Sequence, residues 1–323
     1  MSIKLVDRKM LWGRSGGKCA FCKIPLTTIS DVGHASVIGE EAHIVAREPN
    51  GPRGDSPLDS RQRDNYSNLI LLCPTRHSEI DKVPSGVSEY SVERLLQIKN
   101  DHERSVAQFD GSDSRDQVSA EQWAYVIDQL EERMGWADWT RNTGSIFGPD
   151  APTLSLKMHE RLHNLSKWIF SRVWPEDHRQ LREVIETMNY VILDFLQTFD
   201  EHAEQYANSE YLRTDKFYKI SEWNNERYSA LLGEYKNHVT LVRDLALEMT
   251  RYANWISTKV RDEIDPMYRF EEGVLTVRSD DLLRWQLYRP EFSAAELEQG
   301  QPYKGPEEFR IDRSKRQLRI EAL

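Results

Sequence analysis

The chain has 323 residues, of which 39% are hydrophobic and 30% are charged, and its formal net charge is −10 at pH 7. This composition is typical of a globular protein of one or two domains, and the acidic balance argues against a protein that coats nucleic acid. The longest uncharged apolar stretch, around residues 69–73, is far shorter than the roughly 20 residues of a membrane helix. We therefore predict no membrane span. Because the first residues lack the apolar core of a secretion signal, we expect a cytoplasmic protein.

Charge is distributed unevenly along the chain. Residues 1–103 contain 14 basic and 14 acidic side chains, whereas the remainder contains 29 basic and 39 acidic ones. Binding of DNA by the neutral part would then depend on a local basic face. Its candidate arginines are Arg47, Arg53, Arg61 and Arg63. The alternative is that these arginines pair with the interleaved acids Glu48, Asp55, Asp59 and Asp64.

The first hundred residues predict short elements of both kinds. A Pro-, Gly-, Asp- and Arg-rich segment, 47–67, predicts a loop between two strands. Pro74 or Thr75 at the start of the helix predicted from residue 74 fits the preferred chemistry of helix N-termini. We expect helices at 5–15, from 74 onward and at 91–103, and strands at 40–46 and 68–72.

Three cysteines lie in the first 73 residues. Cys19 and Cys22 follow the turn Gly16-Gly17-Lys18 at C-x-x-C spacing, and Cys73 comes about 50 residues later. An odd number of cysteines with one such pair indicates metal binding in a reducing compartment, not a set of disulfides.

The rest of the chain predicts mainly helices. A linker at 110–116, a helix at 119–134 and a break at 142–153 precede two apolar stripes at helical spacing. The first stripe runs from Leu181 to Phe199 and the second from Tyr235 to Val260, with Pro266 ending the second helix. Alternation at 309–311 and 318–320 predicts a terminal hairpin, with 274–277 as a further strand.

The cysteines, together with His43 in Glu-Ala-His-Ile, Asn68 in Asn-Leu-Ile-Leu-Leu-Cys and His77 after Cys73, form a combined motif. This motif resembles the HNH (ββα-metal, His-Me finger) endonuclease family over about residues 10–103, in particular HNH modules of bacterial restriction and anti-phage defence proteins. With this module at the N-terminus and mainly helices in the rest of the chain, we predict an α+β protein. Its parts would be an HNH nuclease domain with a zinc knuckle at 1–108, a linker with a helix at 109–153, and a helical regulatory or oligomerisation domain at 154–323 that ends in a small β-hairpin.

The resemblance also implies roles for individual residues. His43 would be the general base that takes a proton from the attacking water, and Asn68 would orient it through backbone hydrogen bonds. His77 would hold a catalytic Mg²⁺, Mn²⁺ or Ni²⁺ ion. Cys19, Cys22 and Cys73 would bind a structural Zn²⁺.

Two positions depart from the family pattern. Arg76 occupies the place where many relatives carry a fourth zinc ligand, so that ligand is His77, a remote group such as His34, or absent. Ala42 occupies the place where many relatives carry a metal ligand just before the base, and Glu41 is the candidate substitute.

We therefore predict a metal-dependent HNH endonuclease that hydrolyses DNA phosphodiesters as a regulated effector of anti-phage defence. Expected partners are DNA, a regulatory protein or small-ligand trigger, and further copies of the chain in a homo-oligomer. Two alternatives are a non-catalytic scaffold protein with a zinc-stabilised binding module, and a nuclease that acts on RNA.

Overall fold

The fold is described from a computed structural model, which describes residues 3–29, 35–82, 84–109, 114–205, 209–222, 224–281, 284–300 and 302–313. The chain divides into two compact units, Met1–Asp128 and Gln129–Leu323, which we call unit 1 and unit 2. The boundary lies inside one helix, α6 (Ser114–Met134), within the segment that the sequence analysis treats as a linker.

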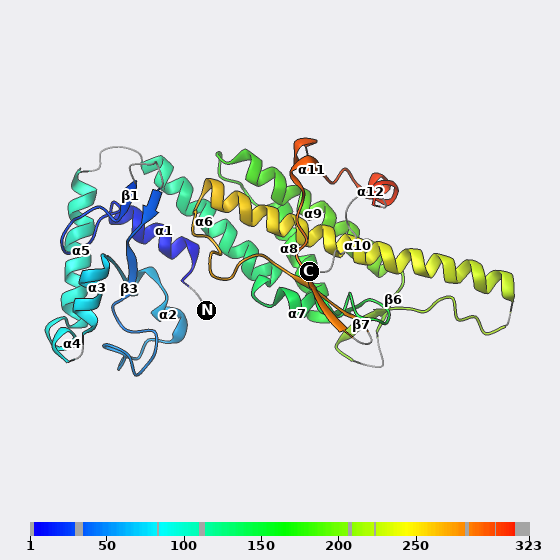
Figure 1. Ribbon diagram of the computed structural model, residues 1–323, viewed down its shortest axis with the longest axis horizontal. Helices are drawn as coiled ribbons and strands as arrows, with labels where there is room; N and C mark the ends of the chain where they lie inside the picture. The colour runs from blue at the N-terminus through cyan, green and yellow to red at the C-terminus, as the bar shows by residue number, and fades with distance from the viewer. Residues whose placement is uncertain are drawn as a thin grey trace. The chain divides into compact units, whose positions relative to one another are not determined.

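Unit 1 consists of short strands and helices, with one longer helix, α5 (Figure 1). The helices predicted at 5–15, from 74 and at 91–103 are confirmed, and so are the strands that end at His43 and Leu72. Two strands, at Thr27–Ile29 and Ala35–Val37, are not predicted from the sequence. The elements are α1 (Leu5–Arg14), β1 (Thr27–Ile29), β2 (Ala35–Val37), β3 (Glu40–His43), α2 (Ser60–Arg63), the 3-10 helix η1 (Tyr66–Asn68), β4 (Leu69–Leu72), α3 (Pro74–Asp81), α4 (Ser85–Glu89) and α5 (Val92–Phe109).

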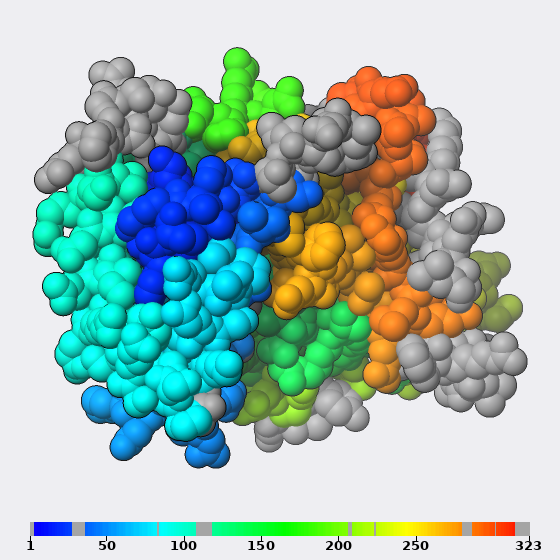
Figure 2. Space-filling view, turned by 60° about the vertical axis from the view of Figure 1, so that its left-hand side comes forward, coloured from blue at the N-terminus to red at the C-terminus, as the bar shows by residue number. Residues whose placement is uncertain are grey.

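The centre of unit 1 is the antiparallel pair β3–β4. His43 lies opposite Leu69 and Glu40 lies opposite Leu72 in this pair. All four residues of β4 are buried, which explains the continuous apolar run in the sequence. Helices α1 and α5 pack against β4, and Figure 2 shows dark-blue α1 beside cyan α5 on one face of the unit. The strand pair and the start of α3 are therefore held on an apolar base.

Unit 2 is dominated by long helices. The longest, α10, has 39 residues, which corresponds to about 58 Å at 1.5 Å per residue. Figure 1 shows its first part extending beyond the other helices of the unit. The elements after α6 are η2 (Trp136–Asp138), α7 (Trp139–Gly144), β5 (Thr153–Ser155), α8 (Leu156–Ser171), α9 (Arg179–Asp200), β6 (Ala203–Gln205), β7 (Tyr211–Thr214), α10 (Asn225–Glu263), β8 (Val277–Asp281), β9 (Arg284–Tyr288), α11 (Ala294–Glu298) and α12 (Pro306–Asp312).

Two apolar stripes form the core of unit 2, as the sequence predicts. The stripe on α9 is buried throughout from Leu181 to Phe199, and α9 packs along α10. The α10 stripe is buried from Val239 to Val260, whereas Tyr235 is only partly buried. Helix α10 ends at Glu263, before Pro266, because proline cannot donate the backbone hydrogen bond that the next turn needs.

The predicted terminal hairpin is wrong in its first strand. Residues 309–311 belong to α12, which starts at Pro306 after Gly305, has two acidic residues in its first turn, and buries Phe309 while Ile311 is 69% exposed. These are helix-start signals, and they outweigh a three-residue alternation. The second predicted strand, 318–320, lies outside the described residues. A hairpin does form earlier, where β8 pairs with β9 and begins at Val277.

Unit 2 also contains a small sheet that the sequence analysis missed. Its order is β5-β7-β6, with all neighbours antiparallel. Strand β5 leads directly into α8, and β6 follows α9 after two residues, so the sheet joins the start of one helix to the end of the next.

The mixture of helices and small sheets confirms the α+β class. Within the described part of the chain, no helix combines the length and the apolar character that crossing a bilayer requires.

Candidate functional site

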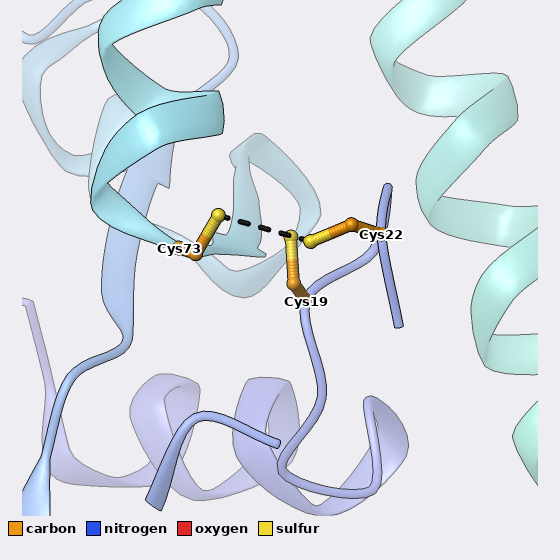
Figure 3. Close-up of side chains that lie close together, drawn as sticks. All are labelled: Cys19, Cys22 and Cys73. Carbon is orange, nitrogen blue, oxygen red and sulfur yellow. Dashed lines mark hydrogen bonds between the residues drawn. The ribbon is translucent and has the colours of Figure 1, made fainter. Parts of the chain in front are cut away.

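The three cysteines converge in unit 1. Their sulfur atoms lie within 4.8 Å of one another, and the Sγ atoms of Cys22 and Cys73 are 3.8 Å apart. Figure 3 shows Cys73, at the start of α3, facing Cys19 and Cys22 on the loop that follows α1. Cys19 and Cys73 are buried, and Cys22 is the most exposed of the three. This cluster could bind a metal ion such as zinc, for which thiolate is a preferred ligand.

Backbone hydrogen bonds shape the loop that carries the first two cysteines. Gly16 and Gly17 both have positive φ, at 57° and 61°, and so turn the chain sharply after α1. The N–H of Ala20 donates to the carbonyl of Leu71 in β4 at 2.9 Å, and the N–H of Lys23 donates to the carbonyl of Cys19 at 2.9 Å. The loop is thereby joined to the strand that leads to Cys73.

The surroundings of the cluster lower the pKa of the Cys19 thiol and raise the pKa of the Cys73 thiol. Burial acts to raise the pKa of Cys19, but hydrogen bonds from the backbone at Cys22 and Cys73 outweigh burial and lower it. Burial raises the pKa of Cys73. Burial also lowers the pKa of Lys23, and the nearby Cys19 and Cys22 oppose that effect. An ammonium group therefore lies close enough to offset part of the negative charge of a metal–thiolate centre.

No fourth ligand joins the cysteines among the described residues. Arg76 pairs instead with Glu79 at 2.5 Å, and both ring nitrogens of His77 contact carboxylates. His34, the remote candidate, lies outside the described residues. The described protein ligands of the cluster are therefore three sulfur atoms.

His43, the predicted general base, is the last residue of β3. Its Nε2 lies 3.0 Å from Oδ1 of Asp64, and the two side chains are 22% and 10% exposed. The other carboxylate oxygen of Asp64 lies 3.5 Å from Nη2 of Arg47, whose side chain is 46% exposed. The imidazole is thus held by a carboxylate in a partly open position, with Nδ1 on the other side of the ring.

Asn68 joins the two strands of the site. Its Oδ1 accepts a hydrogen bond from the N–H of Val45 at 3.0 Å. Its Nδ2 donates to the carbonyls of Val45 at 2.9 Å and Arg63 at 2.8 Å. Asn68 is 5% exposed, so these contacts replace hydrogen bonds to water. They fix the chain just after His43 and just before Asp64. A role of Asn68 in a reaction stays a prediction.

His77 lies on α3 between two carboxylates. Its Nδ1 is 2.6 Å from Oε2 of Glu40, and its Nε2 is 3.3 Å from Oδ2 of Asp81. The hydrogen bond to Asp81 is the largest cause that raises the pKa of His77, with Glu40 adding to it and burial opposing it. Burial acts to raise the pKa of Asp81, but His77 and Arg53 together lower it. The two carboxylates lie at opposite nitrogens of the ring, and the trio is not among the groups of described residues whose ligand atoms all lie within 4.8 Å of one another.

Glu41, the predicted substitute ligand, faces away from this trio. Its Oε1 accepts a hydrogen bond from Nε1 of Trp12 at 2.9 Å and lies 3.0 Å from Nε of Arg8. Side chains alternate along a strand, so Glu40 and Ala42 share one face of β3 while Glu41 and His43 share the other. The structure therefore brings Glu40 to His77, on the face where the family pattern expects a ligand at position 42.

The predicted basic face is partly internal. Arg63 is buried, and its guanidinium donates to four carbonyls of the loop, those of Ala46, Gly54, Ser56 and Leu58. Arg53 is 5% exposed, donates to the carbonyls of Ile44 and Ile80, and pairs with Asp81. These two arginines hold the loop together, whereas Arg47 and Arg61 remain at the surface.

Three site residues were missed by the sequence analysis, and two had a signal. Asp81 follows His77 by four residues, which places both on one helix face, and Glu40 precedes Ala42 by two residues on one strand face. Asp64 had no such signal, because a loop has no fixed period. The structure records no direct pairing of His43 with His77 among the described residues.

No protein-family model matches the chain, and comparison with curated proteins finds no significantly similar sequence.

Proposed function

We propose that unit 1 is a metal-dependent endonuclease of the HNH type that hydrolyses DNA phosphodiesters. The observation that carries the proposal is the His43–Asp64 pair, because the three hydrogen bonds of Asn68 hold the backbone close to both residues, at Val45 and Arg63. A histidine held by a carboxylate in a partly exposed position is the arrangement that general-base catalysis uses.

In this proposal, Nδ1 of His43 accepts a proton from the attacking water. Asp64 contacts Nε2, so it orients the ring and stabilises the imidazolium that forms. Asn68 keeps His43 and Asp64 in register, because it binds backbone next to both. The proton later leaves through solvent, since the His43 side chain is 22% exposed.

A divalent ion fits the His77 trio in its donor chemistry. Imidazole and carboxylate ligands suit Mn²⁺ and Ni²⁺, and the carboxylates also suit Mg²⁺. Both nitrogens of His77 are paired with carboxylates, so an ion would take the place of Glu40 or Asp81 at one nitrogen while the other carboxylate orients the ring. When bound, such an ion would supply positive charge to the scissile phosphate.

Substrate contact would depend on Arg47. This side chain is 46% exposed and reaches Asp64, so it lies beside the proposed base and carries the charge that phosphate requires. We propose that unit 2 regulates or assembles the nuclease, in keeping with an effector of anti-phage defence, a protein or small-ligand trigger, and a homo-oligomer.

The test is plasmid cleavage with each divalent ion in turn. His43→Ala is expected to lower cleavage by about 10²- to 10⁴-fold, which is the range that general acid–base catalysis contributes, with the zinc content unchanged. Asp64→Asn is also expected to lower it, because an amide can donate to Nε2 and so leave the proton on Nδ1, the atom that must accept it. Asp55→Asn, an exposed carboxylate of the same loop, is the matched control. Equal cleavage by wild type and His43→Ala would refute the assignment.

A second candidate function is a non-catalytic binding module stabilised by zinc. The pairing of both His77 nitrogens with carboxylates favours it, because an imidazole held in this way is already satisfied. Calorimetry that finds one tight zinc and no second site for Mn²⁺ or Mg²⁺ would support it. Matched DNA and RNA substrates would test the remaining alternative, a nuclease that acts on RNA.

A further inference from the structure

We infer that unit 2 contains a second metal site, formed by His159, His163 and Asp200, which binds a divalent transition metal such as Zn²⁺ or Ni²⁺. The ligand atoms of the three side chains lie within 4.8 Å of one another. The inference is independent of the proposed nuclease activity, because none of these residues belongs to unit 1.

Helical spacing brings the two histidines together. His159 and His163 are four residues apart in α8, so they occupy one face of the helix, and their ring centroids are 4.6 Å apart. Both rings turn Nε2 toward the same carboxylate: Oδ1 of Asp200 is 2.8 Å from His159, and Oδ2 is 3.7 Å from His163. Two imidazoles that share one carboxylate make a three-donor set.

The position of Asp200 is a second observation that points to a cation. Asp200 is the last residue of α9, and Glu201 follows it directly. Carboxylates are disfavoured at a helix C-terminus, where the helix dipole is negative, so helix stability does not account for the two acids. A positive ion held by Asp200 would offset that unfavourable interaction.

The distances require only small movements to close around an ion. Zinc bonds to histidine nitrogen and carboxylate oxygen of about 2.0–2.2 Å place tetrahedral ligand atoms about 3.3 Å apart. The His159, His163 and Asp200 side chains are 21%, 42% and 40% exposed, so rotation of the outer two meets little packing. This exposure also leaves a coordination position for water.

The donor set selects the class of ion. Two imidazole nitrogens and one carboxylate oxygen suit Zn²⁺, Ni²⁺, Co²⁺ and Cu²⁺, whereas Mg²⁺ and Ca²⁺ prefer oxygen ligands only. The alternative for these residues is a surface ion pair without a ligand, which would bind no metal.

An ion in the proposed site would join the start of α8 to the end of α9. His159 lies near the start of α8, which follows β5 directly. Asp200 is the last residue of α9, and two residues separate it from β6. An ion between them would join the two helix ends to which the sheet β5-β7-β6 is attached. Binding would therefore slow hydrogen exchange in this sheet and at these helix ends.

The experiment is equilibrium dialysis of the untagged full-length chain with Ni²⁺, in wild type and in His163→Gln, with His77→Gln added to both so that the unit 1 trio does not contribute. We expect His163→Gln to weaken the unit 2 site at least about 100-fold, because even indirect partners of metal ligands cost 10- to 100-fold. An excess of Mg²⁺ should leave Ni²⁺ binding unchanged.

The matched control is His178→Gln. His178 also contacts carboxylates, those of Asp177 and Glu263, but it belongs to no three-donor set among the described residues. Asp200→Asn is the second variant and protects the test against misfolding of the first, because the two side chains differ little in size. If both variants bind as much Ni²⁺ as wild type and His178→Gln, or if Ni²⁺ leaves exchange in β5 and β6 unchanged, the site does not exist.

Discussion

Unit 1 and unit 2 are each stabilised internally, but by different kinds of contact. Between α1 and α5, unit 1 has strands of three or four residues and helices of four to eight, whereas unit 2 contains helices of 22 and 39 residues. A long amphipathic helix buries a continuous stripe, whereas a short element buries few apolar side chains of its own. Unit 1 compensates with specific polar links: the cysteine cluster, the buried arginines and Asn68. We therefore expect single polar residues to matter more in unit 1 than in the long-helix core of unit 2, which also buries polar side chains such as Arg251 and Asn254.

The largest effect is expected when one cysteine of the unit 1 cluster is replaced. Cys73→Ser should remove one sulfur of the cluster that could bind zinc, and a structural zinc site would contribute about 10–16 kcal/mol to a small domain. We expect unit 1 to lose its protection from hydrogen exchange while α9 and α10 keep theirs. Exchange resolved by segment, together with zinc content, is the measurement, and Ser78→Ala, exposed on the same helix, is the control. Full protection of β4 in Cys73→Ser would show that no metal supports the unit.

A core substitution addresses the unit 2 side. Phe195 is fully buried on α9, so Phe195→Ala should lower the free energy of unfolding of unit 2 by about 3–5 kcal/mol. Tyr190→Ala, 61% exposed on the same helix, should change it far less. Denaturant unfolding followed by helical circular dichroism measures both. Equal effects of the two substitutions would mean that the α9 stripe does not carry the fold.

The buried His238 makes the free energy of unfolding of unit 2 depend on pH. Burial, with smaller effects of His202 and Arg310, lowers the pKa of His238 to about 4. The folded state therefore binds fewer protons than the unfolded state between pH 6.5 and pH 4, and stability falls as the pH falls through this range. The loss reaches about 3 kcal/mol at pH 4.

His238→Phe keeps an aromatic ring beside His202 and removes the titration. Its free energy of unfolding should fall less steeply than that of wild type between pH 6.5 and pH 4, in denaturant titrations at several pH values. Parallel pH profiles of the two proteins would contradict the assignment.

The smallest effect is expected at an exposed ion pair. Arg179 and Glu183 are four residues apart on α9, with side chains 87% and 44% exposed, and lie 2.8 Å apart. Arg179→Ala should change the free energy of unfolding by no more than about 0.5 kcal/mol, because solvent screens the pair. A larger loss, seen in the same unfolding measurements, would mean that this exposed pair stabilises α9 more than solvent screening allows.

The sequence predicted well those elements that carry a repeating pattern. The stripes on α9 and α10 extend over many turns, so the period of 3.6 is unambiguous, and the buried run of β4 is flanked by clear turn residues. The strands β1, β2 and β5 to β7 have three or four residues each, which is too short for a period to emerge. The same shortness explains why 309–311 was mistaken for a strand.

Spacing along the chain predicted the long helices of unit 2 and grouped the three cysteines as one candidate metal site, and the structure confirms the helices and brings the three sulfur atoms together. The tertiary structure alone shows that Asp64 contacts His43, that Glu40 contacts His77, and that Asp200 contacts the two histidines of α8. The contacts of His43 with Asp64, of His77 with Glu40 and of His159 with Asp200 join residues that are 21, 37 and 41 positions apart in the chain. Local spacing determines which face of an element a residue occupies, but packing between elements determines which residue it meets.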